Sequence, residues 1–261
     1  MNQYFKISKH YQVLLGFILL LAINFFAFEN STNYWLVNTI LILSLIIILY
    51  IGVTRHRLNY FYDSINSGSK PGLSLTFDDG PNPEFTESIL AILKKKKVKA
   101  SFFIIGKNIE GNESLLNKIY TNGHIIANHS MNHTYCFNVL PGSKIAEEII
   151  ATENKINEVI GVKPNFYRTP FGLTSPNVAR GIKKVPVQSI GWDFRSFDTM
   201  ATDEKALLSK LKENAHKSSI ILLHDNNKFT LAVLEAFINY CFTNGIKIVP
   251  LDEMIGIKAY K

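Results

Sequence analysis

The chain has 261 residues, enough for one large domain or for one domain with an appendage. Hydrophobic residues make up 47% of it, and no repeat or low-complexity segment indicates a fibrous or disordered protein. Two cysteines, Cys136 and Cys241, exclude a disulfide framework, and the net charge of +7 gives no reason to expect a nucleic-acid partner.

Two windows near the N-terminus, 11–28 and 34–54, contain no charged residue. Each is about as long as a helix needs to cross a bilayer core of roughly 30 Å. After Thr39 the second window has Ser44 as its one polar side chain before Tyr50, unlike a helix of a soluble core. A signal peptide is the alternative for the first window, but a clean cleavage site is missing. We predict an N-terminal membrane segment, residues 1–62, with a transmembrane hairpin of two helices.

The basic residues beside these helices predict the orientation of the hairpin. Lys6 and Lys9 precede the first helix, Arg55 and Arg57 follow the second, and the turn 29–33 has no basic residue. Basic flanks tend to stay on the cytoplasmic side, which favours a cytoplasmic C-terminal domain at an inner (cytoplasmic) membrane. With two basic residues in each flank, the sequence leaves the side of the membrane open.

Residues 63–70 are polar, which predicts a linker, and residues 71–261 are predicted to form a separate domain. Apolar runs alternate there with amphipathic ones. The predicted strands are 73–77, 100–105, 124–127, 185–190, 220–223 and 247–249, and the predicted helices are 84–96, 113–121, 143–159, 203–215 and 231–242. This alternation indicates an α/β fold with a parallel sheet, either a barrel or an open wound sheet, with its chemistry at the carboxyl ends of the strands.

The run Lys94 to Lys97 ends one of the predicted helices. Cations suit the C-terminal end of a helix dipole, so we expect a solvated helix end. A contact with anionic lipid headgroups or with an anionic glycan is the alternative.

Asp78 and Asp79 directly follow the first predicted strand, in Thr76-Phe77-Asp78-Asp79-Gly80-Pro81. A solvated turn would explain the pair. Adjacent carboxylates in an apolar setting are costly, however, unless a cation or a shared proton relieves their repulsion. Because neighbouring side chains on a strand point to opposite sides, one could bind a metal while the other faces a substrate.

His129 and His133 follow another predicted strand. Four residues apart, they would meet on one side of a helical turn, although a polar loop with two unrelated imidazoles is the alternative. One Asp with two His would leave a coordination position for water. That set indicates a divalent metal, zinc first, with cobalt, nickel or manganese also compatible.

Three later segments also carry polar groups, and each alone could serve as a salt bridge, a cap or a turn. They are RTPFG with Arg168, WDFRSFD with Asp198, and LLHD with His224. In the order TFDDGP, HSMNH, RTPFG, WDFRSFD and LLHD, the sequence resembles the five motifs of the polysaccharide deacetylase family. This family is also called the NodB-homology group or carbohydrate esterase family 4, and the similarity covers about 71–260.

The resemblance implies a distorted (β/α) barrel of the NodB type and a role for each matching residue. It assigns the metal to Asp79, His129 and His133. It makes Asp78 the general base, held by Arg168, and His224 the general acid, oriented by Asp198. It places the substrate against Phe171, Gly172, Leu222 and Trp192, with backbone near Phe171 at the oxyanion and Leu222 in the acyl pocket.

The implied reaction removes an N-acetyl or similar N-acyl group from an amino-sugar polysaccharide or a lipid-linked saccharide. Two positions depart from the family pattern: Thr199 stands where Trp is frequent, and Phe171 stands where Tyr is common. The first puts the shape of the acyl pocket in question. The alternatives are a glycan-binding membrane protein without activity and a glycan O-acetyl esterase. We expect the bilayer and the glycan as partners, and no protein partner.

Overall fold

The computed structural model describes residues 9–216 and 219–261, so Lys6 of the predicted basic flank lies outside the described residues. Its centre is a sheet of seven parallel strands in the order β5-β4-β3-β2-β1-β7-β6. The strands are β1 (Leu73–Gly80), β2 (Ser101–Ile104), β3 (Ile125–Asn128), β4 (Phe166–Tyr167), β5 (Gln188–Ser189), β6 (Phe194–Arg195) and β7 (Ser219–His224).

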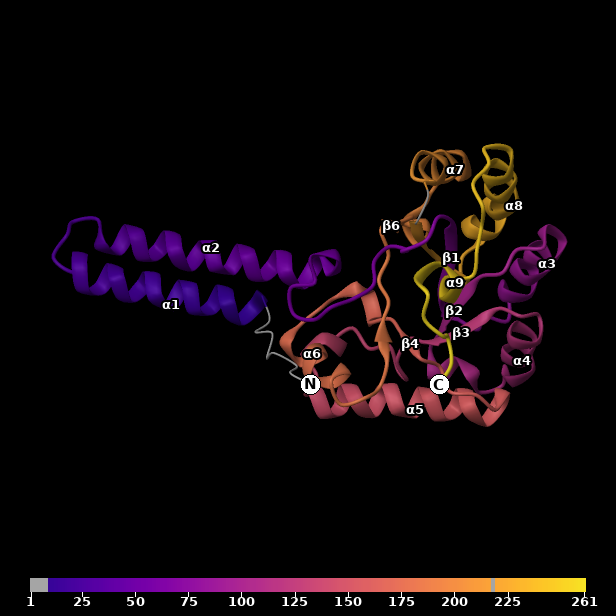
Figure 1. Ribbon diagram of the computed structural model, residues 1–261, viewed down its shortest axis with the longest axis horizontal. Coiled ribbons are helices and arrows are strands. Elements are labelled where there is room, and N and C mark those ends of the chain that lie inside the picture. The colour runs from indigo at the N-terminus through magenta and orange to yellow at the C-terminus, as the bar shows by residue number, and fades with distance from the viewer. Residues whose placement is uncertain (1–8, 217–218) are drawn as a thin grey trace.

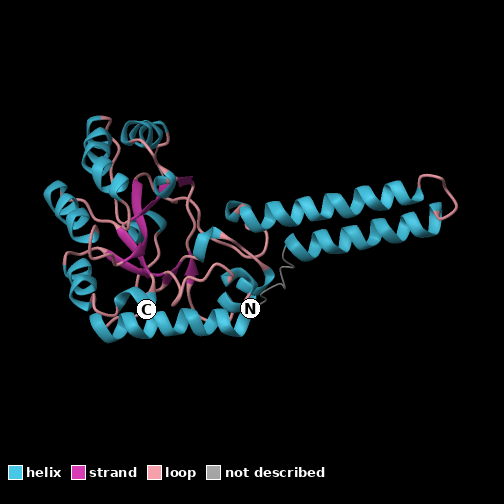
Figure 2. Cartoon of the chain, turned by 180° about the vertical axis from the view of Figure 1, so that it is seen from behind, coloured by secondary structure: helices cyan, strands magenta, loops and turns pink. Residues whose placement is uncertain are grey.

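Helices surround this sheet (Figures 1 and 2). They are α3 (Thr86–Lys96), α4 (Glu113–Thr121), α5 (Gly142–Ile160), α6 (Pro176–Ile182), α7 (Glu204–Glu213), α8 (Lys228–Thr243) and α9 (Leu251–Ile255), with five short 3-10 turns, η1 (His56–Leu58), η2 (Gly106–Ile109), η3 (Phe137–Val139), η4 (Pro170–Gly172) and η5 (Asp198–Met200). The predicted distorted (β/α) barrel is confirmed.

The inner strands of the sheet are buried on both faces, and β1 shows how its residues divide between them. Leu73, Leu75 and Phe77 pack into the main core under the outer helices. Between them, the side chains of Ser74 and Thr76 donate hydrogen bonds to the carbonyls of Val249 (2.7 Å) and Ile221 (2.7 Å). This period of two carries on to Asp78 and brings its carboxylate to the inside of the barrel.

Residues 63–70, which the composition predicts as a linker, lie along the sheet. Ile65 forms a parallel bridge with Ile190, and Ser67 forms an antiparallel bridge with Ser219. The amide of Ile65 donates to the carbonyl of Ser189 at 2.9 Å. The segment is therefore packed onto the domain and is not a free linker, because its backbone groups pair with residues beside β5 and in β7.

Some predicted elements are shorter in the structure, and others went unpredicted. The predicted strand 247–249 is wrong as a strand, since its one ladder partner is Leu73 at the start of β1. The predicted strand 185–190 is reduced to β5. Sequence periodicity cannot detect β4 and β6, because two residues do not make a pattern. The unpredicted α6 begins at a Ser175 cap, whose Oγ accepts from the amide of Val178.

The hairpin consists of α1 (Lys9–Phe28) and α2 (Tyr34–Thr54), which project from one end of the domain (Figure 1). Both are long and apolar enough to cross a membrane, a test that a signal sequence near an N-terminus also passes. Their apolar side chains are mostly exposed, while Asn24 Nδ2 donates to Asn38 Oδ1 at 3.0 Å between the two helices.

The last turn of α2 is attached to the domain. The backbone N–H of Thr174 donates to the carbonyl of Val53 at 2.9 Å, and the Thr174 hydroxyl donates to the carbonyl of Gly52 at 2.7 Å. Tyr60 and Phe61 pack with side chains from both hairpin helices. The segment 170–174 is therefore joined directly to the base of the hairpin.

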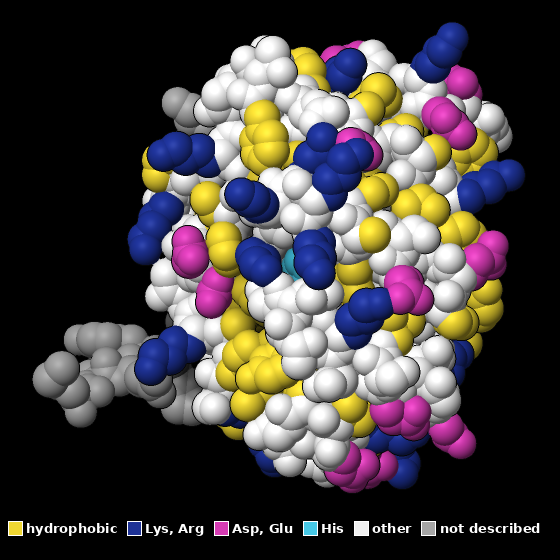
Figure 3. Space-filling model, turned by 90° about the vertical axis from the view of Figure 1, so that its right-hand side faces the viewer, with side chains coloured by type: hydrophobic (Ala, Val, Ile, Leu, Met, Phe, Trp, Pro, Cys, Tyr) yellow, Lys and Arg dark blue, Asp and Glu magenta, His cyan; other side chains and the backbone are white. Residues whose placement is uncertain are grey.

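The lysine run ends α3 at the end of the domain away from the hairpin, the face that Figure 3 shows with its gathered Lys and Arg side chains. Lys95 and Lys96 both pair with Glu235, at 2.8 and 2.9 Å. The side chains of Lys94, Lys95 and Lys97 are exposed there, as expected for a solvated helix end. A contact with anionic lipid headgroups or with an anionic glycan stays the alternative.

Candidate active site

Asp78 and Asp79 end β1 at a break in its pairing with β2. Asp78 pairs with Phe103 and Gly80 with Ile104, so Asp79 is left without a partner, as in a β-bulge. Asp79 has φ of 74°, in the left-handed region. The alternation expected from a regular strand is therefore wrong here: the bulge turns both carboxylates toward one imidazole. Nε2 of His129 lies 3.6 Å from Asp78 Oδ2 and 3.6 Å from Asp79 Oδ1.

His129 and His133 meet in a loop and not on a helical turn, so that part of the prediction is wrong. Ser130 and His133 have φ of 67° and 51°, which no α-helix permits. The loop is held by Glu148 of α5, which accepts from the amides of Met131 (3.1 Å) and Asn132 (2.8 Å). The two imidazole rings end up 4.8 Å apart between centroids.

The ligand atoms of Asp79, His129 and His133 all lie within 4.8 Å of one another. Nδ1 of His129 shares a hydrogen bond of 2.8 Å with the carbonyl of Arg168, which fixes Nδ1 as the donor and leaves Nε2 with its lone pair. Burial, followed by the charge of His133, lowers the pKa of His129 to about 3, so the ring is neutral. Burial also lowers the pKa of His133.

An orphaned oxygen shows that this group fits a cation. Asp79 Oδ1 is buried and accepts no hydrogen bond from the described residues, yet it lies 3.5 Å from His133 Nε2 and 3.6 Å from His129 Nε2. A buried carboxylate oxygen without a donor is costly unless a cation occupies the space beside it. One carboxylate and two neutral imidazoles are the donor set of a zinc-type site.

Arg168 is buried behind the pair of aspartates. Nη1 donates to Asp78 Oδ1 at 2.6 Å and to Thr76 Oγ1 at 2.9 Å, and Nη2 donates to the carbonyl of Gly191 at 2.8 Å. The guanidinium also stacks on Phe103, 3.9 Å from the ring centroid. Arg168 therefore fixes Oδ1 of Asp78 and leaves the other oxygen, Oδ2, facing His129 in the site.

His224 and Asp198 form a second buried pair. Asp198 Oδ1 accepts from His224 Nδ1 at 2.8 Å, and Asp198 Oδ2 accepts from the His224 amide at 2.7 Å and from the Thr230 hydroxyl. Burial lowers the pKa of His224, but the hydrogen bond and charge of Asp198 and the charges of Asp78 and Asp79 raise it to about 9. The imidazolium is therefore stable at neutral pH, with Nδ1 committed and Nε2 free to give a proton.

One cavity of about 140 Å³ collects these groups. Nearly all residues that the sequence predicts for the site line this cavity. Arg168 and Asp198 do not line it, but each is the buried partner of a lining residue, Asp78 and His224 respectively. The lining residues are Asp78, Asp79, His129, His133, Phe171, Gly172, Trp192, Arg195, Thr199, Leu222 and His224.

Some site residues were not singled out from the sequence. Arg195 lines the cavity, and Tyr135 covers the ring of Phe171, with centroids 5.5 Å apart and planes at 14°. Thr230 and Glu148 act from behind, through Asp198 and the HSMNH loop. Arg195 stands inside the WDFRSFD motif, between Asp193 and Asp198, and this place in a motif is the signal that marks it. Nothing local marks the other residues, since their contacts come from other elements.

We expect Gly172→Ala to lower the free energy of unfolding by about 2–5 kcal/mol, as strain and overpacking add. Gly172 has φ of +67°, and a Cβ there would lie 2.2 Å from Cη2 of the buried Trp192. Denaturant unfolding measures the loss. Gly161→Ala is the matched control, with φ of +74° and open space around the added Cβ, so it should cost only about 1 kcal/mol. Equal losses at both positions would contradict the clash.

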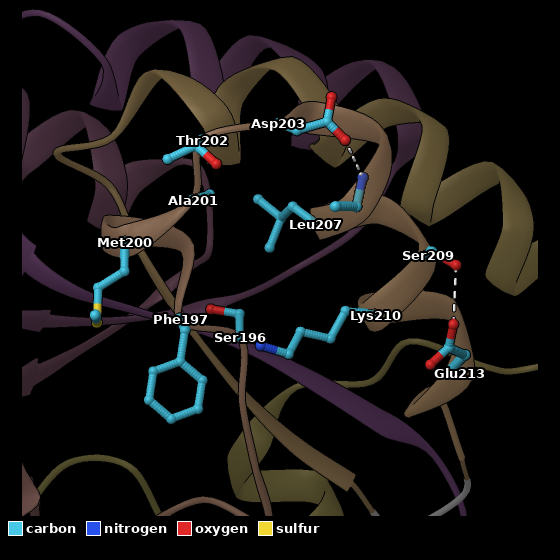
Figure 4. Close-up of a pocket in the computed structure, with 11 residues that line it drawn as sticks. Ser196, Phe197, Met200, Ala201, Thr202, Asp203, Leu207, Ser209, Lys210 and Glu213 are labelled. Carbon is cyan, nitrogen blue, oxygen red and sulfur yellow. Dashed lines mark hydrogen bonds between the residues drawn. The ribbon is translucent and has the colours of Figure 1, made fainter.

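A second hollow of about 650 Å³ lies beside the cavity, between η5 and α7 (Figure 4). Two of its lining residues, Ser196 and Phe197, lie between Arg195 and Asp198 in the sequence. Lys210 points toward Phe197, with Nζ 4.8 Å from the ring centroid.

Comparison with known proteins identifies the family of this chain. The family model described as polysaccharide deacetylase matches residues 66–190. A peptidoglycan-N-acetylglucosamine deacetylase of Bacillus cereus is 30% identical over 199 residues, which cover 75% of this chain and 72% of that protein.

Solved structures show the same fold. A peptidoglycan N-acetylglucosamine deacetylase superposes with a TM-score of 0.72 at 28% identity, over 76% of this chain and 95% of that one. A family 4 pseudoenzyme from Bacillus anthracis superposes with a TM-score of 0.68 at 24% identity, over 74% of this chain and 68% of that one, so it supports the fold alone. The chain belongs to the polysaccharide deacetylase family, carbohydrate esterase family 4.

Proposed function

We propose that this chain is a metal-dependent deacetylase that removes N-acetyl groups from an amino-sugar glycan. The observation that carries the proposal is one cavity with three features: a carboxylate fixed by a buried arginine, a histidine bonded to a buried aspartate, and one Asp and two His whose ligand atoms lie within 4.8 Å of one another. An amide needs all three, because its carbonyl is a weak electrophile and its amine leaves only with a proton.

Asp79, His129 and His133 would hold the cation, which when bound polarises the acyl carbonyl and acidifies water. Asp78 takes the proton of the attacking water on Oδ2, while Arg168 holds Oδ1. His224 then donates from Nε2 to the departing nitrogen. Among the described backbone hydrogen bonds, the amide of Gly172 donates to Thr169 and that of Phe171 donates to none, so the Phe171 amide is the one available to the oxyanion.

Leu222 and Trp192 would bound the acyl group, and Thr199 would leave more room than the Trp frequent in the family. A glycan-binding protein without activity is the less favoured alternative. A missing base or metal ligand would support it, but every charged position of the five motifs is filled. An O-acetyl esterase stays the second candidate, since an ester needs less from the general acid.

The hairpin would anchor the chain in a membrane, and contacts support a site close to that membrane. His56 follows the hairpin closely in the sequence. Its ring Nε2 lies 3.1 Å from the carbonyl oxygen of the cavity residue Trp192, within hydrogen-bond distance. The 170–174 segment is bonded to the last turn of α2. A glycan at the bilayer surface, either a lipid-linked saccharide or the adjacent envelope polymer, fits this placement. A reporter that is active on one side only, fused after Lys261, decides the side.

The direct test uses the full chain in detergent or vesicles with N-acetylglucosamine oligomers, and measures released acetate. We expect chelation to remove both activity and one equivalent of metal per chain, and we expect Zn²⁺ to restore them, with Co²⁺, Ni²⁺ or Mn²⁺ as substitutes. An O-acetylated glycan run in parallel separates amidase from esterase. Undiminished acetate release from protein shown by elemental analysis to be free of metal would contradict the proposal.

A further inference from the structure

Two arginines stand beside the catalytic cavity, and they differ in how their donors are used. Every nitrogen of the Arg168 guanidinium donates: to Thr76, Asp78 and two main-chain carbonyls. Arg195 lines the cavity itself, and its side chain forms no hydrogen bond or ion pair with residues 9–216 and 219–261. Its Nε is buried and unpartnered.

The carboxylates adjacent to Arg195 in the sequence are already committed. Asp193 Oδ1 accepts from the Ser219 hydroxyl (2.7 Å) and the Ile220 amide (2.8 Å), and Asp193 Oδ2 pairs with His216 at 3.0 Å. Asp198 accepts from His224 and Thr230. Neither carboxylate pairs with the Arg195 guanidinium.

The contacts that Arg195 does make hold it at the cavity without satisfying its donors. Its strand position pairs with Leu222 of β7, another residue that lines the cavity. Its Cζ lies 5.0 Å from the Phe197 ring centroid and 6.0 Å from that of Trp192. Stacking on aromatic rings orients a guanidinium. Its N–H groups lie in the plane of the guanidinium and stay able to donate to an anion such as a carboxylate or a phosphate.

We propose that Arg195 is a specificity-determining residue that binds a negatively charged substituent, a carboxylate or a phosphate, on the amino sugar whose acyl group enters the cavity. The inference rests on the proposed deacetylase function. Lys210, whose Nζ also lies close to the Phe197 ring (4.8 Å from its centroid), adds a second cation along the hollow of Figure 4. A neutral sugar would leave both the charge and the buried Nε of Arg195 without a partner.

Three substrates test this with the full chain and bound Zn²⁺. They are a neutral N-acetylglucosamine oligomer, a disaccharide containing N-acetylmuramic acid, and N-acetylglucosamine on a polyprenyl diphosphate. We expect the wild-type protein to prefer one of the two anionic substrates. Arg195→Gln should lower kcat/KM for that substrate about 10- to 100-fold and for the neutral oligomer less than about threefold. The substrate whose kcat/KM falls most in Arg195→Gln shows whether Arg195 binds a carboxylate or a phosphate.

Arg195→Lys keeps the charge without the planar fork and should fall between wild type and Arg195→Gln on the anionic substrate. Arg180→Gln is the matched control, since Arg180 is exposed on α6 and bonded to Asn177, and it should change none of the three rates. If Arg195→Gln does not fold, salt decides with the wild-type protein alone: added NaCl should raise KM for the anionic substrate and not for the neutral one.

A wild-type preference for the neutral oligomer, an equal loss on all three substrates, or KM values that respond to salt alike would overturn the assignment. If the wild-type protein releases acetate from none of them, the deacetylase proposal fails by itself. Calorimetric titration of the muramic acid disaccharide and of the diphosphate then still decides the inference. Weaker binding of one by Arg195→Gln supports it, and equal binding of both by wild type and variant overturns it.

Discussion

Asp78→Asn is expected to lower kcat for acetate release about 10²- to 10⁴-fold while the chain keeps its metal. The amide of Asn can still accept from Arg168, but it cannot take a proton from water at neutral pH. Steady-state kinetics measures the rate, and elemental analysis of the same sample measures the metal. The variant separates the two aspartates, whose nearest oxygens both lie 3.6 Å from His129 Nε2.

The hydrogen bonds indicate which aspartate does which work. Asp78 Oδ1 is occupied by Arg168, whereas Asp79 Oδ1 has no donor among the described residues and lies close to both imidazoles. His129→Ala therefore serves as the contrasting variant: it should lose metal and activity together. Loss of metal from Asp78→Asn would make Asp78 a ligand and refute its assignment as the base, as would a rate close to wild type.

The positions of the chemical groups could be predicted from the sequence because parallel strands end at one edge. Asp78, His129 and His224 each follow an apolar run, and that rule brings them together without further information. The local geometry could not be predicted. The bulge at Asp79 and the positive φ of His133 are conformations that a residue adopts only when its surroundings enforce them.

Contacts between distant segments were also beyond the sequence. A polar stretch such as 63–70 gives no sign that its backbone will pair with β5 and β7, since that depends on where the sheet leaves donors and acceptors open. The bonds from Thr174 to the end of α2 have the same origin. Arg195 stands in the WDFRSFD motif, but only the folded chain shows that its buried Nε has no partner among the described residues.

Asp198→Asn should lower kcat/KM about 10²- to 10⁴-fold near neutral pH and move the alkaline limb of its pH profile to lower pH. His224 must carry its proton to donate it, so activity is lost as pH rises through the His224 pKa. In the native protein, Asp198, Asp78 and Asp79 raise that pKa from 6.5 to about 9, against the effect of burial. A bound cation offsets the contribution of the two site aspartates, so we expect the native limb between these two values.

Without the Asp198 charge, burial is the largest influence on the pKa of His224. Burial lowers that pKa, so Nε2 no longer carries a proton at neutral pH. Ser196→Ala is the matched control, because it removes a 3.0 Å hydrogen bond to the same carboxylate and no charge, and its limb should stay in place. An acetate ester of a good phenolic leaving group gives the decisive comparison. Its oxygen departs without a proton, so Asp198→Asn should slow it far less than the amide. An equal loss on both substrates would show that Asp198 supports the site as a whole and does not act through the proton of His224.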